Sequence, residues 1–451
     1  MAAPVPGSQE RTPVHLTVIG TGYLGTVHAA CLADLGFEVL GVDSDPARTG
    51  TLSRGEPPFR EPGLGALLRR GVRSGRLRFT TSLPAAAQFG DVHFLCVGTP
   101  QRAGQPHADL SQLYACVDAL APLLERPCLV AGKSTTPVGT AAALATRLAT
   151  LAPAGPRAEL AWNPEFLREG HAIADTIQPD RIVAGVRSAR AEAVLREVYR
   201  KPLAAGTPLV VTDLATAELV KVAANAFLAT KISFINAMAE VCHAASADVM
   251  VLTEALGHDA RIGAAGMMPG LGFGGGCLPK DIRAFLARAE ELGAGQALAF
   301  LRNVDAINAR CRSRAVAAAR ELTGGSLAGR AVGVLGAAFK PGTDDIRDSP
   351  ALAVAASLSD LGARVTLYDP AATDRACTAF PQLAGAESAE AAARDADVLL
   401  VLTEWDEFRN ADPDVLGKAV RQRRVLDARH ALDPVRWRAA GWTYHALGRR
   451  W

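Results

Sequence analysis

The stretch VHLTVIGTGYLGTVHAACLADLGFEVLGVD, residues 14–43, decides the fold of this chain. Its first six residues are typical of a buried strand, and residues 26–35 have the composition of a helix. The turn between them has the spacing G-x-G-x-x-G, which leaves bare backbone and a helix N-terminus to receive a pyrophosphate. We therefore predict a dinucleotide site with cofactor contacts from Gly20, Gly22, Tyr23, Leu24 and Gly25.

The acid after the next apolar run, residues 37–42, indicates which dinucleotide is bound. Asp43 stands about 20 residues after the glycine turn, where a carboxylate accepts hydrogen bonds from the ribose hydroxyls and repels a 2′-phosphate. We therefore predict NAD rather than NADP. Arg48 is also expected at the cofactor, and its positive charge complicates this choice.

The rest of the chain continues in an α/β pattern with a helical interruption. Residues 215–245 contain no Pro or Gly and predict one long helix, a connector or dimer spine; a glycine-rich segment, 263–276, follows, with helical sequence again over 280–322. Further short apolar runs predict strands at 92–97, 128–131, 331–335, 364–368, 398–402 and 425–426. The predicted fold class is α/β, with two Rossmann-like doubly wound domains joined by a central helical dimerisation region. The predicted boundaries are 14–213, 214–322 and 323–451.

Composition excludes several classes of function. With 48 Lys and Arg against 46 Asp and Glu, the net charge is only +2, without the basic stripe that a nucleic-acid partner needs. The eight cysteines are scattered, with neither C-x-x-C nor zinc spacing, so we expect no metal and a reducing compartment. Residues 1–13 lack an apolar signal region, and no segment runs uncharged for the roughly 18 residues of a membrane span. We expect a soluble cytoplasmic protein with no membrane partner.

Four polar segments carry the expected chemistry: KSTTPVG at 133–139, NPEFLREG at 163–170, residues 218–225, and GFGGGCLPKD at 272–281. Cys277 follows the glycines at the expected start of a helix, where the helix dipole favours a thiolate. It is the best nucleophile among the eight cysteines, since the others lie in apolar strands or helices, where Cys usually acts as a small hydrophobe.

Each remaining residue of these segments also has a purely structural interpretation. Lys221 and Asn225 lie four apart on one helix face, yet most helix lysines are simply solvated. Glu165 and Glu169 fit a solvated acidic helix start, and Asp281 fits a helix cap. Only together do these groups favour catalysis, because ammonium and amide stabilise alkoxide charge while carboxylates activate water.

With these segments in this order, the chain resembles the UDP-glucose/GDP-mannose dehydrogenase family over residues 14–442. The shared motifs are V-x-T-P, K-S-T-x-P-x-G, P-E-F-L-x-E-G, the lysine-asparagine helix, G-F-G-G-x-C-x-x-K-D and F-K-x-x-T-D-D-x-R, which stand here at 97–100, 133–139, 164–170, 221–225, 272–281 and 339–347. The resemblance implies a homodimer or higher homo-oligomer and a two-step, four-electron oxidation of UDP-glucose by NAD. The aldehyde is captured by Cys277 as a thiohemiacetal, oxidised to a thioester and hydrolysed.

The resemblance also implies roles for individual residues. Catalysis falls to Cys277, Lys221, Asn225, Asp281, Thr135 and Glu165. Further cofactor contacts fall to Thr99, Thr135, Glu169, Lys280 and Arg347. Substrate contacts fall to Glu165, Phe166, Leu167, Arg168, Lys221, Asn225, Arg261, Gly266, Met267, Met268, Pro269, Gly270, Gly274 and Lys340, with Arg261 donated across the dimer.

The sequence departs from the family at Gly266, where an aromatic is usual, so sugar specificity does not follow from the resemblance there. A relative acting on GDP-mannose or a UDP-N-acetylhexosamine is the alternative enzyme, although residues 229–236 look more like the UDP-glucose branch. A non-catalytic NAD-binding paralogue is the alternative of another class, since a fold does not fix a function. The presence of Cys277, Lys221, Asn225 and Asp281 together argues against it.

Overall fold

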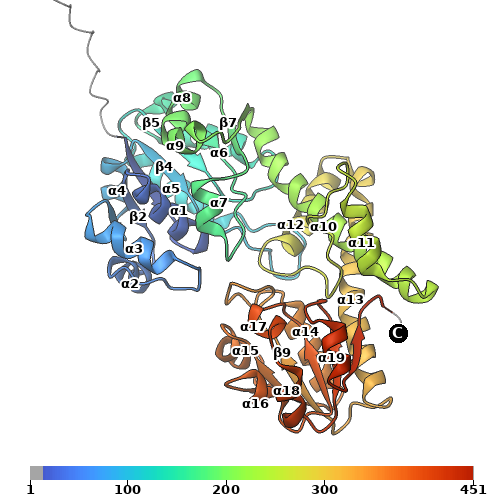
Figure 1. The fold of residues 1–451 in the computed structure, drawn as a ribbon. Helices are drawn as coiled ribbons and strands as arrows, with labels where there is room; N and C mark the ends of the chain where they lie inside the picture. The colour runs from blue at the N-terminus through green and yellow to red at the C-terminus, as the bar shows by residue number, and fades with distance from the viewer. Residues whose placement is uncertain (1–13, 450–451) are drawn as a thin grey trace, which may run out of the picture. The chain divides into compact units, whose positions relative to one another are not determined.

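The computed structural model describes residues 14–449, which divide into two compact units (Figure 1). The N-terminal unit contains residues 14–100 and 109–221, and the C-terminal unit contains residues 101–108 and 222–449. Residues 1–13, in which the sequence predicts no signal region, lie outside the described part of the chain.

The N-terminal unit is built on an eight-stranded sheet in the order β3-β2-β1-β4-β5-β6-β7-β8. Neighbouring strands are parallel except at β6 and β7, which pair antiparallel through Trp162 and Gly185. The parallel pairing typical of a doubly wound sheet is therefore interrupted once. The strands are β1 (His15–Ile19), β2 (Glu38–Val42), β3 (Leu77–Thr80), β4 (Val92–Leu95), β5 (Cys128–Gly132), β6 (Ala158–Trp162), β7 (Ile182–Gly185) and β8 (Leu209–Thr212).

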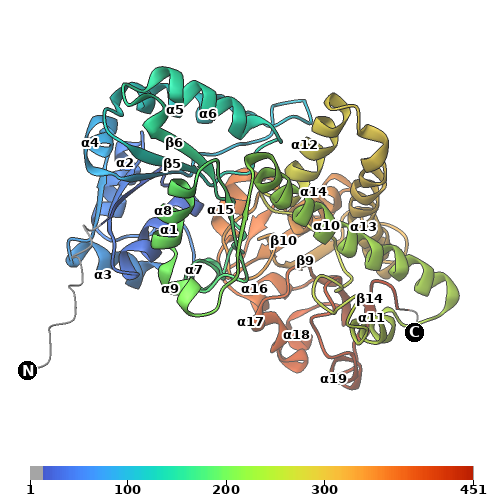
Figure 2. The same cartoon turned by 90° about the horizontal axis from the view of Figure 1, so that it is seen from above.

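Helices cover both faces of this sheet (Figures 1 and 2). Alternation along β1 explains why two cores form: Leu16 and Val18 pack into one apolar cluster, and Ile19 packs into the other. The helices are α1 (Tyr23–Asp34), α2 (Pro46–Ser53), α3 (Leu64–Arg73), α4 (Leu83–Phe89), α5 (Ser111–Leu120), η1 (Ala121–Leu123), α6 (Thr140–Leu151), η2 (Gly155–Arg157), α7 (Ala172–Ile177), α8 (Ala189–Val198) and α9 (Arg200–Ala204).

The C-terminal unit contains a six-stranded parallel sheet in the order β11-β10-β9-β12-β13-β14, which is the Rossmann order 3-2-1-4-5-6. The predicted second α/β domain is thus present. Its strands are β9 (Ala331–Leu335), β10 (Arg364–Tyr368), β11 (Ala384–Gly385), β12 (Val398–Val401), β13 (Arg424–Asp427) and β14 (Thr443–Ala446). Its helices are α14 (Pro350–Asp360), α15 (Thr373–Ala379), α16 (Ala389–Ala393), α17 (Asp406–Arg409), α18 (Pro413–Ala419) and α19 (Pro434–Ala439).

The expected long helix is α10 (Leu214–Ala245), and the division between the units falls within it. Helices α11 (Val249–Gly257), α12 (Leu278–Glu291), η3 (Gly295–Leu298) and α13 (Phe300–Leu322) follow. The helical sequence expected over 280–322 forms two α-helices, α12 and α13, and the first ends before Gly293, whose φ is +77°.

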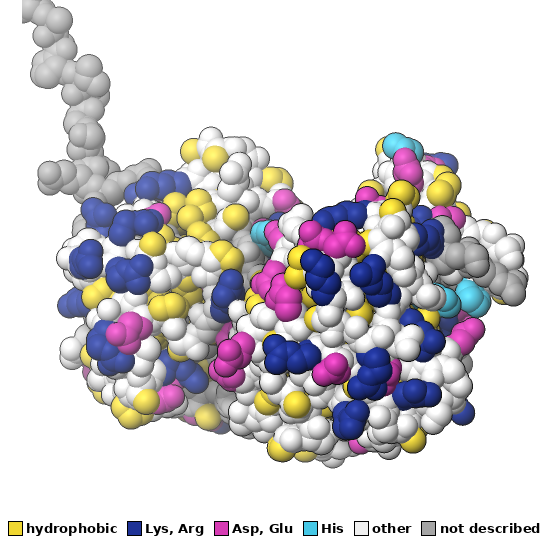
Figure 3. Space-filling model, turned by 60° about the horizontal axis from the view of Figure 1, so that its bottom comes forward, with side chains coloured by type: hydrophobic (Ala, Val, Ile, Leu, Met, Phe, Trp, Pro, Cys, Tyr) yellow, Lys and Arg dark blue, Asp and Glu magenta, His cyan; other side chains and the backbone are white. Residues whose placement is uncertain are grey.

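Helix α10 is also the one described helix, within residues 14–449, that is long and apolar enough to cross a membrane. Its mean hydropathy reaches 1.3 over an 18-residue window, of which 39% is buried. Because core helices of soluble proteins pass the same test, length and composition alone decide little. On the molecular face in Figure 3, basic and acidic side chains are interspersed, as the net charge of +2 leads one to expect.

Candidate active site

The glycine turn between β1 and α1 has one open position. A Cβ at Gly20, whose φ is +91°, would lie 2.9 Å from the main chain of Cys96, and a Cβ at Gly25 would collide with the carbonyl oxygen of Gly20. A Cβ at Gly22 would meet nothing within 4 Å. Gly22 is also the N-cap of α1 and offers no side-chain cap, so the N-terminal N–H groups of α1 remain available to a phosphate. This turn fits a dinucleotide.

Asp43 lies immediately after β2 and is only 8% exposed. Its Oδ2 accepts hydrogen bonds from the N–H of Thr21 at 2.8 Å and from Nη1 of Arg48 at 3.0 Å. Burial raises the pKa of Asp43, but the N–H groups of Asp45 and Thr21 and the guanidinium of Arg48 outweigh burial, so the pKa falls below its usual value. The carboxylate is charged and already holds a cation.

Glu218 of α10 anchors the segment 133–139 from one side. Its buried carboxylate accepts hydrogen bonds from Thr136 Oγ1 at 3.0 Å and from the N–H of Gly139 at 2.8 Å. From the other side, Thr99 Oγ1 donates to the carbonyl oxygen of Thr135 at 2.8 Å. The main chain at Thr135 is therefore fixed by the two segments expected to meet the cofactor and the sugar.

Glu165 and Lys221 form a buried ion pair. Lys221 Nζ lies 3.0 Å from Glu165 Oε1, and the side chains are 7% and 13% exposed for lysine and glutamate. The N–H of Leu167 donates to Glu165 Oε2 at 2.8 Å, and the ammonium lies 5.6 Å from the ring centroid of Phe166. Lys221 is thus no solvated surface lysine. An ammonium and a carboxylate at this distance can share a proton or orient one polar ligand.

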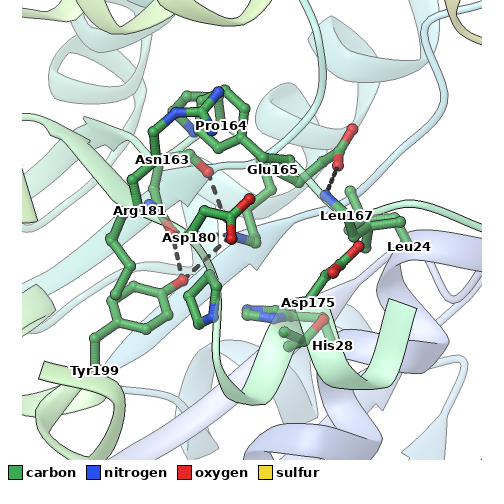
Figure 4. Close-up of a pocket in the computed structure, with 15 residues that line it drawn as sticks. Leu24, His28, Asn163, Pro164, Glu165, Leu167, Asp175, Asp180, Arg181 and Tyr199 are labelled. Carbon is green, nitrogen blue, oxygen red and sulfur yellow. Dashed lines mark hydrogen bonds between the residues drawn. The ribbon is translucent and has the colours of Figure 1, made fainter. Parts of the chain in front are cut away.

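A second polar group lies beside this pair, in a pocket of about 50 Å³ (Figure 4). Lys133 Nζ donates to Asn163 Oδ1 at 3.0 Å and lies 3.2 Å from the hydroxyl of Tyr199. Burial, and then the charge of Lys133, hold the pKa of His28 well below its usual range, so that imidazole is neutral. A pocket of this size admits a few water molecules and is too small for a nucleotide sugar. It is lined by Leu24, His28, Lys133, Asn163, Pro164, Glu165, Phe166, Leu167, Asp175, Thr176, Pro179, Asp180, Arg181, Ile182 and Tyr199.

In the C-terminal unit, α12 begins directly after Cys277, which is its N-cap and is exposed. In the first turn, Asp281 is 3% exposed and accepts a hydrogen bond from Asn225 Nδ2 at 2.7 Å. The ammonium of Lys280 pairs with the other carboxylate oxygen of Asp281. The N–H of Asp281 donates to the carbonyl oxygen of Cys277 at 3.0 Å, so the thiol and the acid are fixed on one helical turn.

Five of the other seven cysteines, Cys31, Cys96, Cys116, Cys128 and Cys242, pack in apolar clusters as the sequence predicts, whereas Cys311 is buried outside these clusters and Cys377 is half-buried. All eight fall within residues 14–449, and none forms a disulfide. Burial raises the pKa of Cys31, Cys96 and Cys116 to about 12. It also raises the pKa of Cys128, Cys242, Cys311 and Cys377. These thiols stay protonated and unreactive near neutral pH.

The glycine-rich loop before Cys277 packs against the segment 339–350. The guanidinium of Arg347 lies directly over Gly276, leaving no room for a Cβ, and is held by Asp345. A Cβ at Gly274 would collide with the main chain of Asp348. The half-buried Lys340 lies with its ammonium 5.4 Å from the ring centroid of Phe339. Arg347 and Gly274, both predicted ligand contacts, therefore lie in two segments of the C-terminal unit that pack against each other.

The other predicted substrate residues differ from one another in burial and in contacts. Met267 is 2% exposed and packs in a small apolar core, whereas Met268 is 52% exposed. The N–H of Gly270 donates to Asn236 Oδ1 at 2.8 Å, which fixes the loop at its end. The side chain of Arg261 is 89% exposed and pairs with Asp259, so its predicted role across a dimer stays a prediction. Gly266 and Pro269 lie in the same loop, outside helix and strand.

Two features of the site differ from the sequence interpretation. Residues 163–170 form a loop, so an acidic helix start at Glu165 and Glu169 is wrong. In this loop Arg168 pairs with Asp175 at 2.7 Å. Sequence reasoning also missed Glu61, a buried acid that bonds both Tyr23 and the N–H of Gly170. The only signal for it was an acid beside a Pro-Gly turn, which many surface loops share.

Comparisons with known proteins cover nearly the whole chain. Models of the UDP-glucose/GDP-mannose dehydrogenase family match residues 14–203 (NAD binding domain), 215–310 (central domain) and 333–434 (UDP binding domain). A UDP-glucose 6-dehydrogenase from Rhizobium meliloti is 42% identical over 96% of this chain and 99% of that protein. The structure is similar to a UDP-glucose dehydrogenase from Pyrobaculum islandicum, with TM-score 0.90, 37% identity and coverage of 99% and 100% of the two chains. A UDP-D-ManNAc dehydrogenase from Pyrococcus horikoshii has TM-score 0.84 at 27% identity, with coverage of 97% and 99%.

Proposed function

This chain belongs to the UDP-glucose/GDP-mannose dehydrogenase family, and from that premise we propose that it oxidises UDP-glucose to UDP-glucuronate. The overall reaction consumes two NAD⁺ and one water and yields two NADH. The observation that carries the proposal is the set of polar groups already described, on a chain similar over nearly all its length to UDP-glucose 6-dehydrogenases. The cofactor is NAD, as the family's N-terminal domain implies.

The cofactor residues fit this assignment. The open backbone at Gly22 and the uncapped start of α1 receive the pyrophosphate, and Asp43 receives the adenosine ribose. When bound, NAD⁺ accepts the hydride of each oxidation. Thr99, Glu169, Lys280 and Arg347 stay proposed cofactor contacts.

Cys277 supplies the nucleophile in the proposed reaction. After the first oxidation its sulfur adds to the aldehyde carbon, giving a thiohemiacetal, and the second oxidation gives a thioester. Exposure at the start of α12 supports this role, since the substrate must reach the thiol and the helix terminus favours its anion. The positive and amide groups of Lys221 and Asn225 stabilise the oxyanions that precede each oxidation.

Hydrolysis of the thioester needs a positioned water and a base. Glu165, held by Lys221, and Asp281, held by Asn225, are the proposed carboxylates for this step, with Thr135 as a further positioning group. The water adds to the thioester carbon and gives up its proton, and the sulfur of Cys277 leaves as the thiolate. The product is the sugar carboxylate.

The substrate assignment rests on the UDP-glucose branch. The proposed contacts are residues 165–168, Arg261, the 266–270 loop, Gly274 and Lys340. A panel of nucleotide sugars with NADH absorbance as the readout tests it. UDP-glucose should have the highest kcat/KM and release two NADH per sugar. A clear preference for GDP-mannose or a UDP-N-acetylhexosamine, or one NADH per sugar, would contradict the assignment.

We also propose a soluble, cytoplasmic homodimer or higher homo-oligomer, with functional parts at 14–213, 214–322 and 323–451. Buried polar side chains along α10 support the soluble assignment, since Glu218 and Ser233 hydrogen-bond inside the protein rather than facing lipid. Fractionation of cells tests this point: the enzyme should stay in the supernatant without detergent.

A further inference from the structure

Glu61 is a buried carboxylate that the proposed chemistry does not use. It lies between α2 and α3 and is only 6% exposed. Its Oε2 accepts hydrogen bonds from the hydroxyl of Tyr23 and, at 2.7 Å, from the N–H of Gly170. Its Oε1 accepts a hydrogen bond from the N–H of Ala172 at 2.8 Å. Both oxygens of one acid are therefore occupied by donors from distant parts of the chain.

These donors come from the two ligand-binding segments of the N-terminal unit. Tyr23 belongs to the glycine turn and opens α1, whereas Gly170 ends the loop that carries Glu165 and Glu169. The N–H of Gly170 also lies 3.2 Å from the Tyr23 hydroxyl, so the three groups form a closed triangle. The turn and the loop are 147 residues apart in sequence and meet through this acid.

The phenol of Tyr23 is a permanent donor in this triangle. Burial, followed by the hydrogen bond and the charge of Glu61, raises the pKa of Tyr23 far above the physiological range. Gly170 has φ +82°, a backbone conformation that favours glycine. Glu61 thus joins the end of the 163–170 loop to the start of α1.

We propose that Glu61 is a positioning residue that couples dinucleotide binding to nucleotide-sugar binding. The inference rests on the proposed function, in which the glycine turn holds NAD and residues 165–168 of the 163–170 loop hold the sugar nucleotide. A ligand that orders either segment orders the shared acceptor and with it the other segment. The second ligand then binds a segment that is already ordered, so it loses less conformational entropy and binds more tightly. This is positive coupling. By thermodynamic linkage, each ligand raises the affinity for the other by the same factor.

Fluorescence titration with NADH, with and without saturating UDP-glucose, measures the coupling as the ratio of the two NADH affinities. No reaction occurs during the titration, because NADH cannot oxidise the sugar alcohol. In the wild type, UDP-glucose should tighten NADH binding by roughly fivefold or more. Tyr23→Phe removes the phenolic hydroxyl and leaves the hydrogen bonds that the N–H groups of Gly170 and Ala172 donate to Glu61. Glu61→Gln replaces one acceptor oxygen with a donor. Each should bring the affinity ratio close to one, and the double variant should lower it no further.

Tyr114→Phe, on α5 of the same unit, is the matched control and should keep the wild-type ratio. Thermal melting shows whether each variant is folded. If Glu61→Gln does not fold, the affinity ratio of Tyr23→Phe alone tests the inference. A wild-type ratio of one, or a ratio that survives in folded Tyr23→Phe, overturns the inference. So does an equal loss of affinity with and without UDP-glucose, which marks a merely structural role. Failure of the wild type to bind either ligand overturns the proposed function itself.

Discussion

Cys277 differs from the other cysteines in both exposure and position, and this difference gives a test at a single sulfur. Cys277→Ser exchanges one sulfur atom for oxygen and so replaces the thiol with a hydroxyl, a far weaker nucleophile near neutral pH. Steady turnover should fall by roughly a thousandfold or more, while NADH binding survives. Mass spectrometry after incubation with UDP-glucose and NAD⁺ shows whether a slow ester adduct forms. Cys311→Ser, at a buried thiol, is the control, and wild-type turnover by Cys277→Ser would remove this sulfur from the mechanism.

Asp43 carries a prediction that the structure makes sharper. Its carboxylate holds Arg48 at 3.0 Å, so Asp43→Ala removes the repulsion of a 2′-phosphate and also releases a guanidinium to meet it. The ratio of kcat/KM for NAD to that for NADP should fall by roughly tenfold or more. Asp34→Ala, at an exposed acid paired with Arg70, should leave the ratio unchanged. An unaltered ratio in Asp43→Ala would show that other groups choose the cofactor.

At the scale of single residues, the sequence predicted those groups whose chemistry is tied to local spacing. The glycines at 20, 22 and 25, Asp43 and Cys277 all lie beside the element that the pattern required. The ion pair between Glu165 and Lys221 was predicted only as membership of one site, because their distance depends on tertiary packing. Glu61 was missed for the same reason: its donors lie up to 111 residues away, and nothing local marks it.

At the scale of secondary-structure elements, β4 contributes a buried histidine that makes stability depend on pH. His93 is fully buried, with Nδ1 2.7 Å from Thr17 Oγ1 on β1, and burial lowers its pKa to about 4. Below pH 6.5 the His93 imidazole binds a proton in the unfolded chain but stays neutral in the folded chain. The free energy of unfolding therefore falls as the pH drops from 6.5 towards 4. Between pH 7 and pH 5 this group should cost about 2 kcal/mol. The urea midpoint of the wild type should therefore fall further over this range than that of His93→Gln, and equal falls would refute the assignment.

The elements themselves were predictable where the pattern was strong. The proline-free stretch gave α10 to within one residue, and the apolar run 364–368 matches β10. The break after α12 was not predicted, because glycines inside an otherwise helical composition are tolerated in many helices and only the structure shows the positive φ at Gly293. The antiparallel β7 was also hidden, since strand direction depends on the path of the connecting loop and not on strand composition.

At the scale of the whole molecule, two α/β units followed from the repeated strand-helix alternation, and both sheets are present. One short segment belongs to a different unit from the residues that flank it in the sequence. Residues 101–108 leave the N-terminal unit between β4 and α5 and belong by their contacts to the C-terminal unit. Within that unit His107 lies 3.3 Å from Glu291 at the end of α12. Composition could not reveal this assignment, because it arises from tertiary contacts of a polar loop.

Self-association is the prediction that involves the whole molecule. Phe227, Phe234 and Val241 are 68%, 48% and 56% exposed, and their spacing of seven residues puts them on one stripe of α10. A soluble protein rarely leaves such a stripe in water, so we expect a second copy of this chain to cover it. Phe227→Glu combined with Phe234→Glu places charges in the stripe and should shift the mass measured by light scattering from dimer or larger to monomer. Val435→Glu changes an apolar side chain on α19 that is 74% exposed and should leave the mass unchanged. Circular dichroism verifies that the variants are folded, and a folded double variant with the wild-type mass would place the interface elsewhere.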